Sequence, residues 1–141
     1  SLYSASIAGV KIELNIRGLC CLRPGIAGVS DNIRVVRVVD RFLEHARIYY
    51  FENGGDPEMY MGSSDIMPRN LLARVETLFP ILDKEMLVSI RDNILRVHLD
   101  DNVKASELTA DGTYVPVARK KKDTAVRSQK WFIDHRGCWH G

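Results

Sequence analysis

One histidine and two short polar clusters stand out from an otherwise ordinary sequence. His45 comes just before the apolar segment 48–51, and the clusters Gly62-Ser63-Ser64-Asp65 and Pro68-Arg69-Asn70 follow the next short apolar segment. This layout combines an imidazole, a guanidinium fork and backbone N–H groups that a ligand can approach closely. Because these are the groups that hold phosphate, the pattern predicts a phosphate-binding site.

Two further arginines could extend this site. Arg17 ends a segment of alternating apolar and polar residues, and ligands bind at the carboxyl ends of strands in open α/β sheets. Arg74 offers a second, permanently charged fork. It could equally pair with Glu76 or Asp65 on the surface.

Each candidate also has a plainer interpretation. A lone histidine before a strand is more often a surface or capping residue, Arg17 could be a solvated strand-end arginine, and Asn70 could serve only a turn. The basic run 119–122 is more often a solvated loop than a phosphate track. The case for a site depends on a hairpin, which would bring Gly62 beside His45.

Motifs for several other chemistries are missing from the sequence. It contains no GxGxxG or Walker A loop, no GxSxG nucleophile elbow, and no HExxH or cysteine–histidine spacing for zinc. Asp100 and Asp101 are adjacent, so their carboxylates diverge and cannot form an acid/base couple. We expect no metal ligand in this chain, and Cys20, Cys21 and Cys138 are predicted to be free thiols in a reducing compartment.

The composition is typical of one globular domain. The 141 residues are 45% hydrophobic and 27% charged, and the formal net charge is +2. With so little net charge, any anion site must come from local clustering of basic residues. No apolar run reaches the roughly 18 residues of a transmembrane helix. No signal peptide is recognisable, since Lys11 and Glu13 interrupt the early apolar stretch.

Strands and turns are predicted for the first half of the chain. Alternating and β-branched segments predict strands over residues 10–16, 33–39, 48–51, 59–61 and 74–78. Turns, or in the first case one helical turn, are predicted over 40–44 and 53–56. A helix over 2–8 without a start signal suggests that the chain was cut from a longer protein.

Helices dominate the second half of the prediction. The clearest one begins after Asp83, a good N-cap, and ends at 100–102, with Leu87, Ile90, Ile94 and Val97 on one face. Residues 103–118 are expected to be irregular or hairpin-like, 124–134 a short helix and 136–141 a frayed tail. The whole predicts a mixed α/β sheet domain with too few helices to cover both faces.

The pattern His45-x-Arg47 with Glu52 and Gly62-Ser63-x-Asp65 resembles a degenerate phospholipase D motif in which Arg, Glu and Asp replace Lys, Asp and Asn. A closer resemblance depends on five segments, which are Ile16–Gly25, Asp31–Arg34, Arg41–Arg47, Phe51–Gly55 and Met67–Asn70. In this order they resemble the C-terminal domain of bacterial polyphosphate kinase.

The resemblance implies an α/β, phospholipase-D-like mixed sheet flanked by helices. It also implies an enzyme that reversibly transfers the terminal phosphate of ATP to inorganic polyphosphate, with the phosphorylated histidine in a preceding domain and the Mg²⁺ ligands outside this chain. Arg17 and His45 match the family's nucleotide-phosphate-binding arginine and second histidine, and Arg74 matches another basic position of its tunnel. Arg69 and Asn70 lie in a family motif, and their phosphate-binding role is our own inference.

The resemblance also sets expectations for the whole enzyme. Residues 1–118 are expected to form the C-terminal catalytic-site domain without its N-terminal part, and residues 119–141 its basic segment and C-terminal helix or tail. Alone, the chain is predicted to be inactive, whereas His45 is catalytic in the full enzyme. The expected partners are ATP or ADP, polyphosphate, the remaining domains and further copies of the full-length enzyme. The expected location is cytoplasmic, with membrane association of the full-length enzyme left open, and neither nucleic acid nor a transmembrane segment is expected.

Two other functions stay open from the sequence alone. A phospholipase-D-type phosphodiesterase would use His45 as its own nucleophile, and a phosphohistidine trapped in the isolated chain would favour it. A non-catalytic polyanion-binding module would use Arg34, Arg37 and the run 119–122. Salt-steep binding without nucleotide preference would favour that second alternative.

Overall fold

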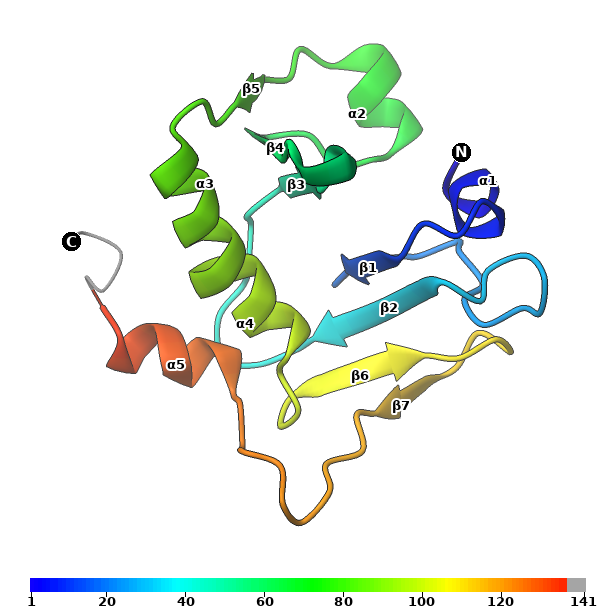
Figure 1. Cartoon of the computed structure of the whole chain (residues 1–141), viewed down its shortest axis with the longest axis vertical. Coiled ribbons are helices and arrows are strands. Elements are labelled where there is room, and N and C mark those ends of the chain that lie inside the picture. The colour runs from blue at the N-terminus through cyan, green and yellow to red at the C-terminus, as the bar shows by residue number, and fades with distance from the viewer. Residues whose placement is uncertain (137–141) are drawn as a thin grey trace. The chain divides into compact units, whose positions relative to one another are not determined.

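The computed structural model describes residues 1–136, which fall into two compact units (Figure 1). Unit 1 comprises Ser1–Phe42 and the chain from Val97 onward, and unit 2 comprises Leu43–Arg96. Each unit has its own sheet. The mixed α/β class predicted from the sequence is confirmed.

Unit 1 is built on a four-stranded sheet of order β1-β2-β6-β7. β1 runs parallel to β2, and the β2–β6 and β6–β7 pairs are antiparallel. The helices of this unit are α1, the end of α4, and α5. Their bounds are α1 Leu2–Ile7, β1 Ile12–Asn15, β2 Ile33–Val38, α4 Arg96–Leu99, β6 Ala105–Leu108, β7 Tyr114–Pro116 and α5 Ser128–Asp134.

The core of unit 1 lies around the central strand β2. The neighbours Val35 and Val36 point to opposite faces of the sheet, yet both are fully buried, so β2 is covered on both sides. The two arginines of this strand are tied down by neighbours. Arg34 donates to Glu107 and to the backbone oxygen of Leu99, both at 3.1 Å, and the guanidinium of Arg37 lies 3.9 Å from the centre of the Tyr114 ring.

A buried carboxylate joins three segments of unit 1. Asp101, 1% exposed, follows α4 and accepts the backbone N–H groups of Val103, Lys104 and Ala105 at 2.7–3.2 Å. It also accepts the backbone N–H and the hydroxyl of Ser128, the first residue of α5, both at 2.8 Å. Burial alone would raise the pKa of Asp101, but these hydrogen bonds outweigh it and lower the pKa.

Unit 2 contains a three-stranded antiparallel sheet of order β3-β4-β5 and a long helix that begins after Asp83. The Asp83 carboxylate accepts the backbone N–H of Met86 at 2.9 Å, so the predicted N-cap is confirmed. In the middle of the helix, Arg91–Leu95 form a π-helical turn. The bounds in this unit are β3 Ile48–Phe51, η1 Asn53–Gly55, β4 Glu58–Gly62, α2 Pro68–Ala73, β5 Leu78–Pro80, α3 Lys84–Ile90 and η2 Arg91–Leu95.

The predicted strand over 74–78 is wrong. The strand at this place is β5, Leu78–Pro80, and it is preceded by a helix, α2, that the sequence analysis missed. Proline favours the first turn of a helix, and Pro68 begins α2. Residues 74–77 are irregular, and Thr77 binds Ser63 through its backbone N–H and oxygen just before β5 begins.

The other predicted elements are confirmed: β3 has the predicted bounds, β4 is longer than predicted, and the remaining helices and strands are shorter. Residues 103–118 form the β6–β7 hairpin. The 40–44 segment bends without a helical turn. Of the predicted frayed tail, residues 137–141, including Cys138, lie outside the described part of the chain. Within residues 1–136, none of the helices combines the length and apolar character needed to cross a membrane.

Candidate functional site

His45 lies on the segment that enters β3, and Arg47 holds it there. The Nη1 atom of Arg47 donates to the backbone oxygen of His45 and lies 3.4 Å from its ring nitrogen Nδ1. The other edge of the guanidinium donates to Oδ1 of Asp65, from Nε at 3.0 Å and from Nη2 at 2.6 Å. The backbone N–H of Gly62 donates to the Arg47 oxygen at 3.1 Å, so the hairpin brings Gly62 next to this segment as predicted.

Gly62 is required by the close approach of two backbone segments. A Cβ atom at this position would lie 2.5 Å from the backbone oxygen of Thr77, which is too close for any side chain. The next residue continues the contact. The Ser63 N–H donates to the Thr77 oxygen at 3.0 Å, and the Thr77 N–H donates to the Ser63 hydroxyl at 3.1 Å.

A second cluster forms around the carboxylate of Glu76. The Ser63 hydroxyl donates to Oε2 at 2.6 Å, and the Asn70 amide donates to Oε1 at 2.9 Å. These two hydrogen bonds, the first from Ser63 and the second from Asn70, lower the pKa of Glu76. Asn70 is 4% exposed, so it is a buried helix residue and not a plain turn residue. Its Oδ1 atom has no hydrogen-bond partner among the described residues.

Arg69 and Arg74 lie between the members of this cluster in the sequence, on either side of Asn70, and both are exposed. The alternative that Arg74 pairs with Asp65 or Glu76 is not what the structure shows. Asp65 pairs with Arg47, and Glu76 is held by Ser63 and Asn70, while Arg74 acts on Glu76 only through its charge. Among residues 1–136, neither guanidinium is paired with a carboxylate.

Arg17 belongs to unit 1, whereas the other four predicted site residues belong to unit 2. It follows β1 directly after Ile16, whose N–H donates to the Val36 oxygen at 2.9 Å. Its side chain is exposed, and it too is free of a carboxylate partner in the described part of the chain. The strand-end position predicted from the sequence is therefore confirmed, and the role of Arg17 in binding stays a prediction.

The structure adds three residues that sequence reasoning did not assign to the site. Asp65 orients Arg47, Glu76 gathers Ser63 and Asn70, and Thr77 fixes the turn. The sequence indicated Asp65 as a member of the polar cluster after Gly62, as a motif position and as a possible partner of Arg74, and Glu76 only as a possible partner of Arg74. No sequence signal marks Thr77, because its contribution is made by its backbone.

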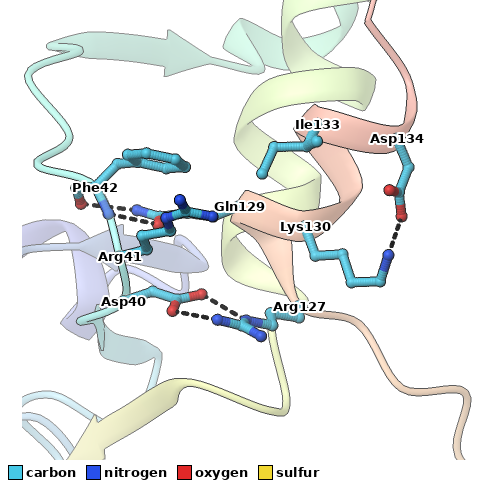
Figure 2. A pocket seen from close by; sticks show the side chains of 8 residues that line it. All are labelled: Asp40, Arg41, Phe42, Arg127, Gln129, Lys130, Ile133 and Asp134. Atoms are coloured by element: carbon cyan, nitrogen blue, oxygen red, sulfur yellow. Dashed lines mark hydrogen bonds and ion pairs between the residues drawn. The ribbon is translucent and has the colours of Figure 1, made fainter.

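A small hollow of about 190 Å³ lies in unit 1 beside α5 (Figure 2). Its polar groups mostly satisfy one another. Arg127 donates to both oxygens of Asp40, at 2.7 and 2.8 Å, and lowers the pKa of that carboxyl. The Gln129 amide binds the backbone N–H and oxygen of Phe42 at 2.7 and 2.8 Å. The hollow therefore anchors the segment that precedes His45 in the chain.

The described residues do not offer a fit for Mg²⁺. This ion prefers several oxygen ligands in octahedral geometry, whereas Asp65 is bound by Arg47, and Glu76 by Ser63 and Asn70. Within residues 1–136, no three His, Cys, Asp or Glu side chains are grouped closely enough to hold a metal ion.

Taken together, these features define a mixed α/β module with a hairpin-mounted histidine and exposed, unpaired arginines. Comparison with known proteins identifies it. The sequence model of the polyphosphate kinase C-terminal domain 2 matches residues 1–129, so the chain belongs to that family.

The relatives agree with the family match. A polyphosphate kinase of Prosthecochloris aestuarii is 56% identical over 133 residues, which are 94% of this chain and 18% of the relative. One from Bacillus cereus is 58% identical over 131 residues, 93% of this chain and 18% of the relative. The crystal structure of polyphosphate kinase from Porphyromonas gingivalis is similar with a TM-score of 0.89 and 41% identity, over 99% of this chain and 21% of that one. The chain thus spans about a fifth of the proteins it matches.

Proposed function

We propose that this chain supplies phosphate- and nucleotide-binding side chains to an enzyme that reversibly transfers the terminal phosphate of ATP to inorganic polyphosphate. One observation carries the proposal: Arg17, Arg69 and Arg74 are exposed and without carboxylate partners among the described residues, within the region that matches the family. Unpaired guanidinium forks are suited to phosphate oxygens, which they can bind with two parallel hydrogen bonds.

Other arginines of the chain support this by contrast. Arg34, Arg91 and Arg127 each donate to a carboxylate at 2.7–3.1 Å, so their charges are already used within the fold. A polyanion bound by the chain as a whole would need arginines such as Arg34 and Arg37. Since Arg34 is held by Glu107 and Arg37 packs on Tyr114, the polyanion-module alternative is less favoured.

Each site residue then has a proposed task. Arg17 and Arg74 neutralise the charge that spreads over the phosphate oxygens during transfer. His45 acts at the leaving or attacking oxygen, and Arg69 binds further phosphate. Asn70 is buried and donates one amide N–H to Glu76, so its proposed contribution falls to the second N–H of that amide. The residue that accepts the phosphoryl group lies outside this chain, in the remaining four-fifths of the full-length enzyme.

The remaining parts of the proposal come from the family and not from these residues. They are ATP or ADP and polyphosphate as substrates, Mg²⁺ held by ligands outside the chain, assembly of the full-length enzyme with further copies of itself, and a cytoplasmic location. When bound, Mg²⁺ would neutralise phosphate charge, and the arginines of this chain would share that task.

The test measures ATP formation from ADP and polyphosphate by the full-length parent enzyme. Arg17→Ala should lower kcat/KM by roughly 10²-fold, as loss of a preorganised donor does elsewhere, while the thermal midpoint stays unchanged. The matched control is Arg119→Ala, an exposed arginine in unit 1 outside the site.

Three outcomes would contradict the proposal. If Arg17→Ala lowers the thermal midpoint together with the activity, Arg17 has a structural role. If Arg119→Ala lowers kcat/KM equally, the polyanion-binding module is favoured instead. Phosphohistidine formed at His45 by the isolated 141-residue chain would instead support the phosphodiesterase alternative, because we expect that chain alone to have no turnover.

A further inference from the structure

The contact between Arg47 and the His45 ring is the feature of the site with the sharpest chemical consequence. The Arg47 guanidinium is fixed along one edge by two hydrogen bonds to Asp65, at 2.6 and 3.0 Å. Its third nitrogen, Nη1, is thereby held against His45, where it reaches the backbone oxygen and lies 3.4 Å from Nδ1 of the ring. The arginine is partly buried, while His45 itself is exposed.

This geometry favours one position for the proton of the neutral ring. A guanidinium has five N–H donors and no acceptor. The nitrogen that faces it must therefore present a lone pair, and in a neutral imidazole the proton then sits on the other nitrogen, Nε2. A proton on Nδ1 would set two N–H donors against each other.

We propose that Arg47 and Asp65 are positioning residues that hold His45 as the Nε2–H tautomer, so that His45 serves phosphoryl transfer as a hydrogen-bond donor and not as a proton shuttle. This inference rests on the proposed function, because the acceptor is a phosphoryl oxygen. Phosphate oxygens only accept hydrogen bonds, and Nε2–H is the ring donor that Arg47 leaves available.

The position of the Arg47 cation agrees with this role. Arg47 lies on the same segment, Asp65 faces Arg47 from the segment after β4, and Glu44 precedes His45 in the chain. A shuttle would have to bind a second proton at Nδ1, which is the nitrogen that faces the Arg47 cation. A donor needs no change of protonation during the reaction, which suits a transfer dominated by charge stabilisation.

The first test reads the tautomer directly. The full-length enzyme is labelled with ¹⁵N-histidine, and long-range ¹H–¹⁵N spectra are recorded at about pH 8.5. The His45 signals are identified by their loss in His45→Gln. We expect one tautomer, protonated at Nε2, in the wild type, and a mixture in Arg47→Met and in Asp65→Asn.

The matched control is Arg91→Met. It removes another arginine of unit 2 that is paired with an aspartate, Asp92 at 2.7 Å, and it should leave the His45 signals unchanged. A wild-type His45 that is mixed or protonated at Nδ1 would overturn the proposal. So would wild-type signals in both Arg47→Met and Asp65→Asn, and the second variant covers the case in which the first does not fold.

The second test is kinetic and uses the difference in side-chain length between glutamine and asparagine. Glutamine places its NH₂ group near the position of Nε2, and asparagine places it near Nδ1. His45→Gln should therefore keep about 10-fold more activity than His45→Asn or His45→Ala, which is the worth of about one hydrogen bond. The ratio should hold from pH 6 to 9, and equal loss in all three variants would point to a proton shuttle.

The two proposals fail in different ways. If the full-length wild type forms no ATP from ADP and polyphosphate, the proposed function fails, while the tautomer spectrum still tests Arg47. If the wild type is active and His45→Gln is no better than His45→Asn, the function stands and the donor role of His45 is wrong.

Discussion

Each unit has a carboxylate that gathers hydrogen-bond donors, but the two carboxylates differ in burial and in what surrounds them. In unit 1, Asp101 is buried and receives five hydrogen bonds that join the end of α4, β6 and α5. In unit 2, Glu76 gathers Ser63 and Asn70 close to the surface and leaves Arg69 and Arg74 unpaired nearby in the sequence. The first arrangement stabilises a fold, and the second leaves two guanidinium groups at the surface, where we propose that they bind phosphate.

The two units also differ in how many apolar side chains they bury. Unit 1 buries a set of aliphatic residues around β2, whereas the fully buried apolar side chains of unit 2, among those described, are Met59 and Leu87. Several large apolar residues of unit 2 are exposed, namely Ile66, Leu71, Leu72, Val75, Leu78 and Leu82. Since apolar burial is the main stabilising term in folding, unit 1 should contribute more of the stability, and substitutions should separate the units by effect.

The largest effect is expected at Asp101. Asp101→Asn keeps the size of the side chain but replaces an acceptor with an NH₂ group that faces N–H donors. Unfolding of the 141-residue chain in urea should show a loss of about 3 kcal/mol, because several buried donors lose their partner. The control Asp56→Asn changes an exposed carboxylate 3.9 Å from Lys84 and should leave the transition unchanged.

The same variant predicts an acid dependence. The pKa of Asp101 in the folded chain is lowered, so its stabilising effect is present above the unfolded pKa of about 4 and is lost as pH falls through the lower folded value. The wild type should therefore lose stability below pH 4 more steeply than Asp101→Asn. Parallel curves for the two proteins would mean that the buried carboxylate is not the stabilising group.

A smaller effect is expected at Gln129, on the hollow of Figure 2. Its side chain is 4% exposed and binds both backbone groups of Phe42. Gln129→Ala should cost about 2 kcal/mol in the same urea experiment, because two hydrogen bonds are lost. Its neighbour Lys130 is exposed, and Lys130→Ala should have little effect. An equal cost for the two variants would contradict this account of the hollow.

The smallest effect on stability is expected at Arg69 and Arg74. Both are exposed and have no carboxylate partner among the described residues, so Arg69→Gln and Arg74→Gln should leave the unfolding midpoint of the chain unchanged. In the full-length enzyme each should lower kcat/KM by about 10-fold or more, because a phosphate contact is lost. A stability loss as large as that of Gln129→Ala would mean that these arginines stabilise the fold, as the paired arginines of unit 1 do.

Much of the fold could be predicted from local patterns. The alternation before Arg17, the β-branched run of β2 and the Asp83 cap each depend on neighbouring residues only, and each is confirmed. The region after Gly62 could not be read in this way. There the chain is shaped by contacts between segments 13–15 residues apart, such as that of Ser63 with Thr77, and these override the strand propensity of residues 74–78.

The candidate site was predictable in its residue types but not in its pairings. Histidine, glycine and arginine near a hairpin indicated phosphate, and the hairpin does bring Gly62 to Arg47. The sequence could not show that Arg47 pairs with Asp65 or that Asn70 is buried against Glu76. The second contact depends on α2, the helix that carries Asn70 and that the sequence analysis missed. The first joins the segment before β3 to the segment after β4, residues 18 apart, which local patterns cannot show.

Gly62 has a consequence for how this chain can vary. The backbone there is not in the left-handed region, so the position excludes other residues through lack of space: an added Cβ would lie 2.5 Å from the Thr77 oxygen and 3.1 Å from the Leu78 side chain. Glycines in turns such as Gly54, with a φ of 66° and open space, can still be replaced by asparagine at modest cost. At Gly62 no other amino acid is tolerated in this way, because even the single Cβ of alanine produces the full steric clash. In a mutational scan its profile should be all-or-none, with no gradation by side-chain size.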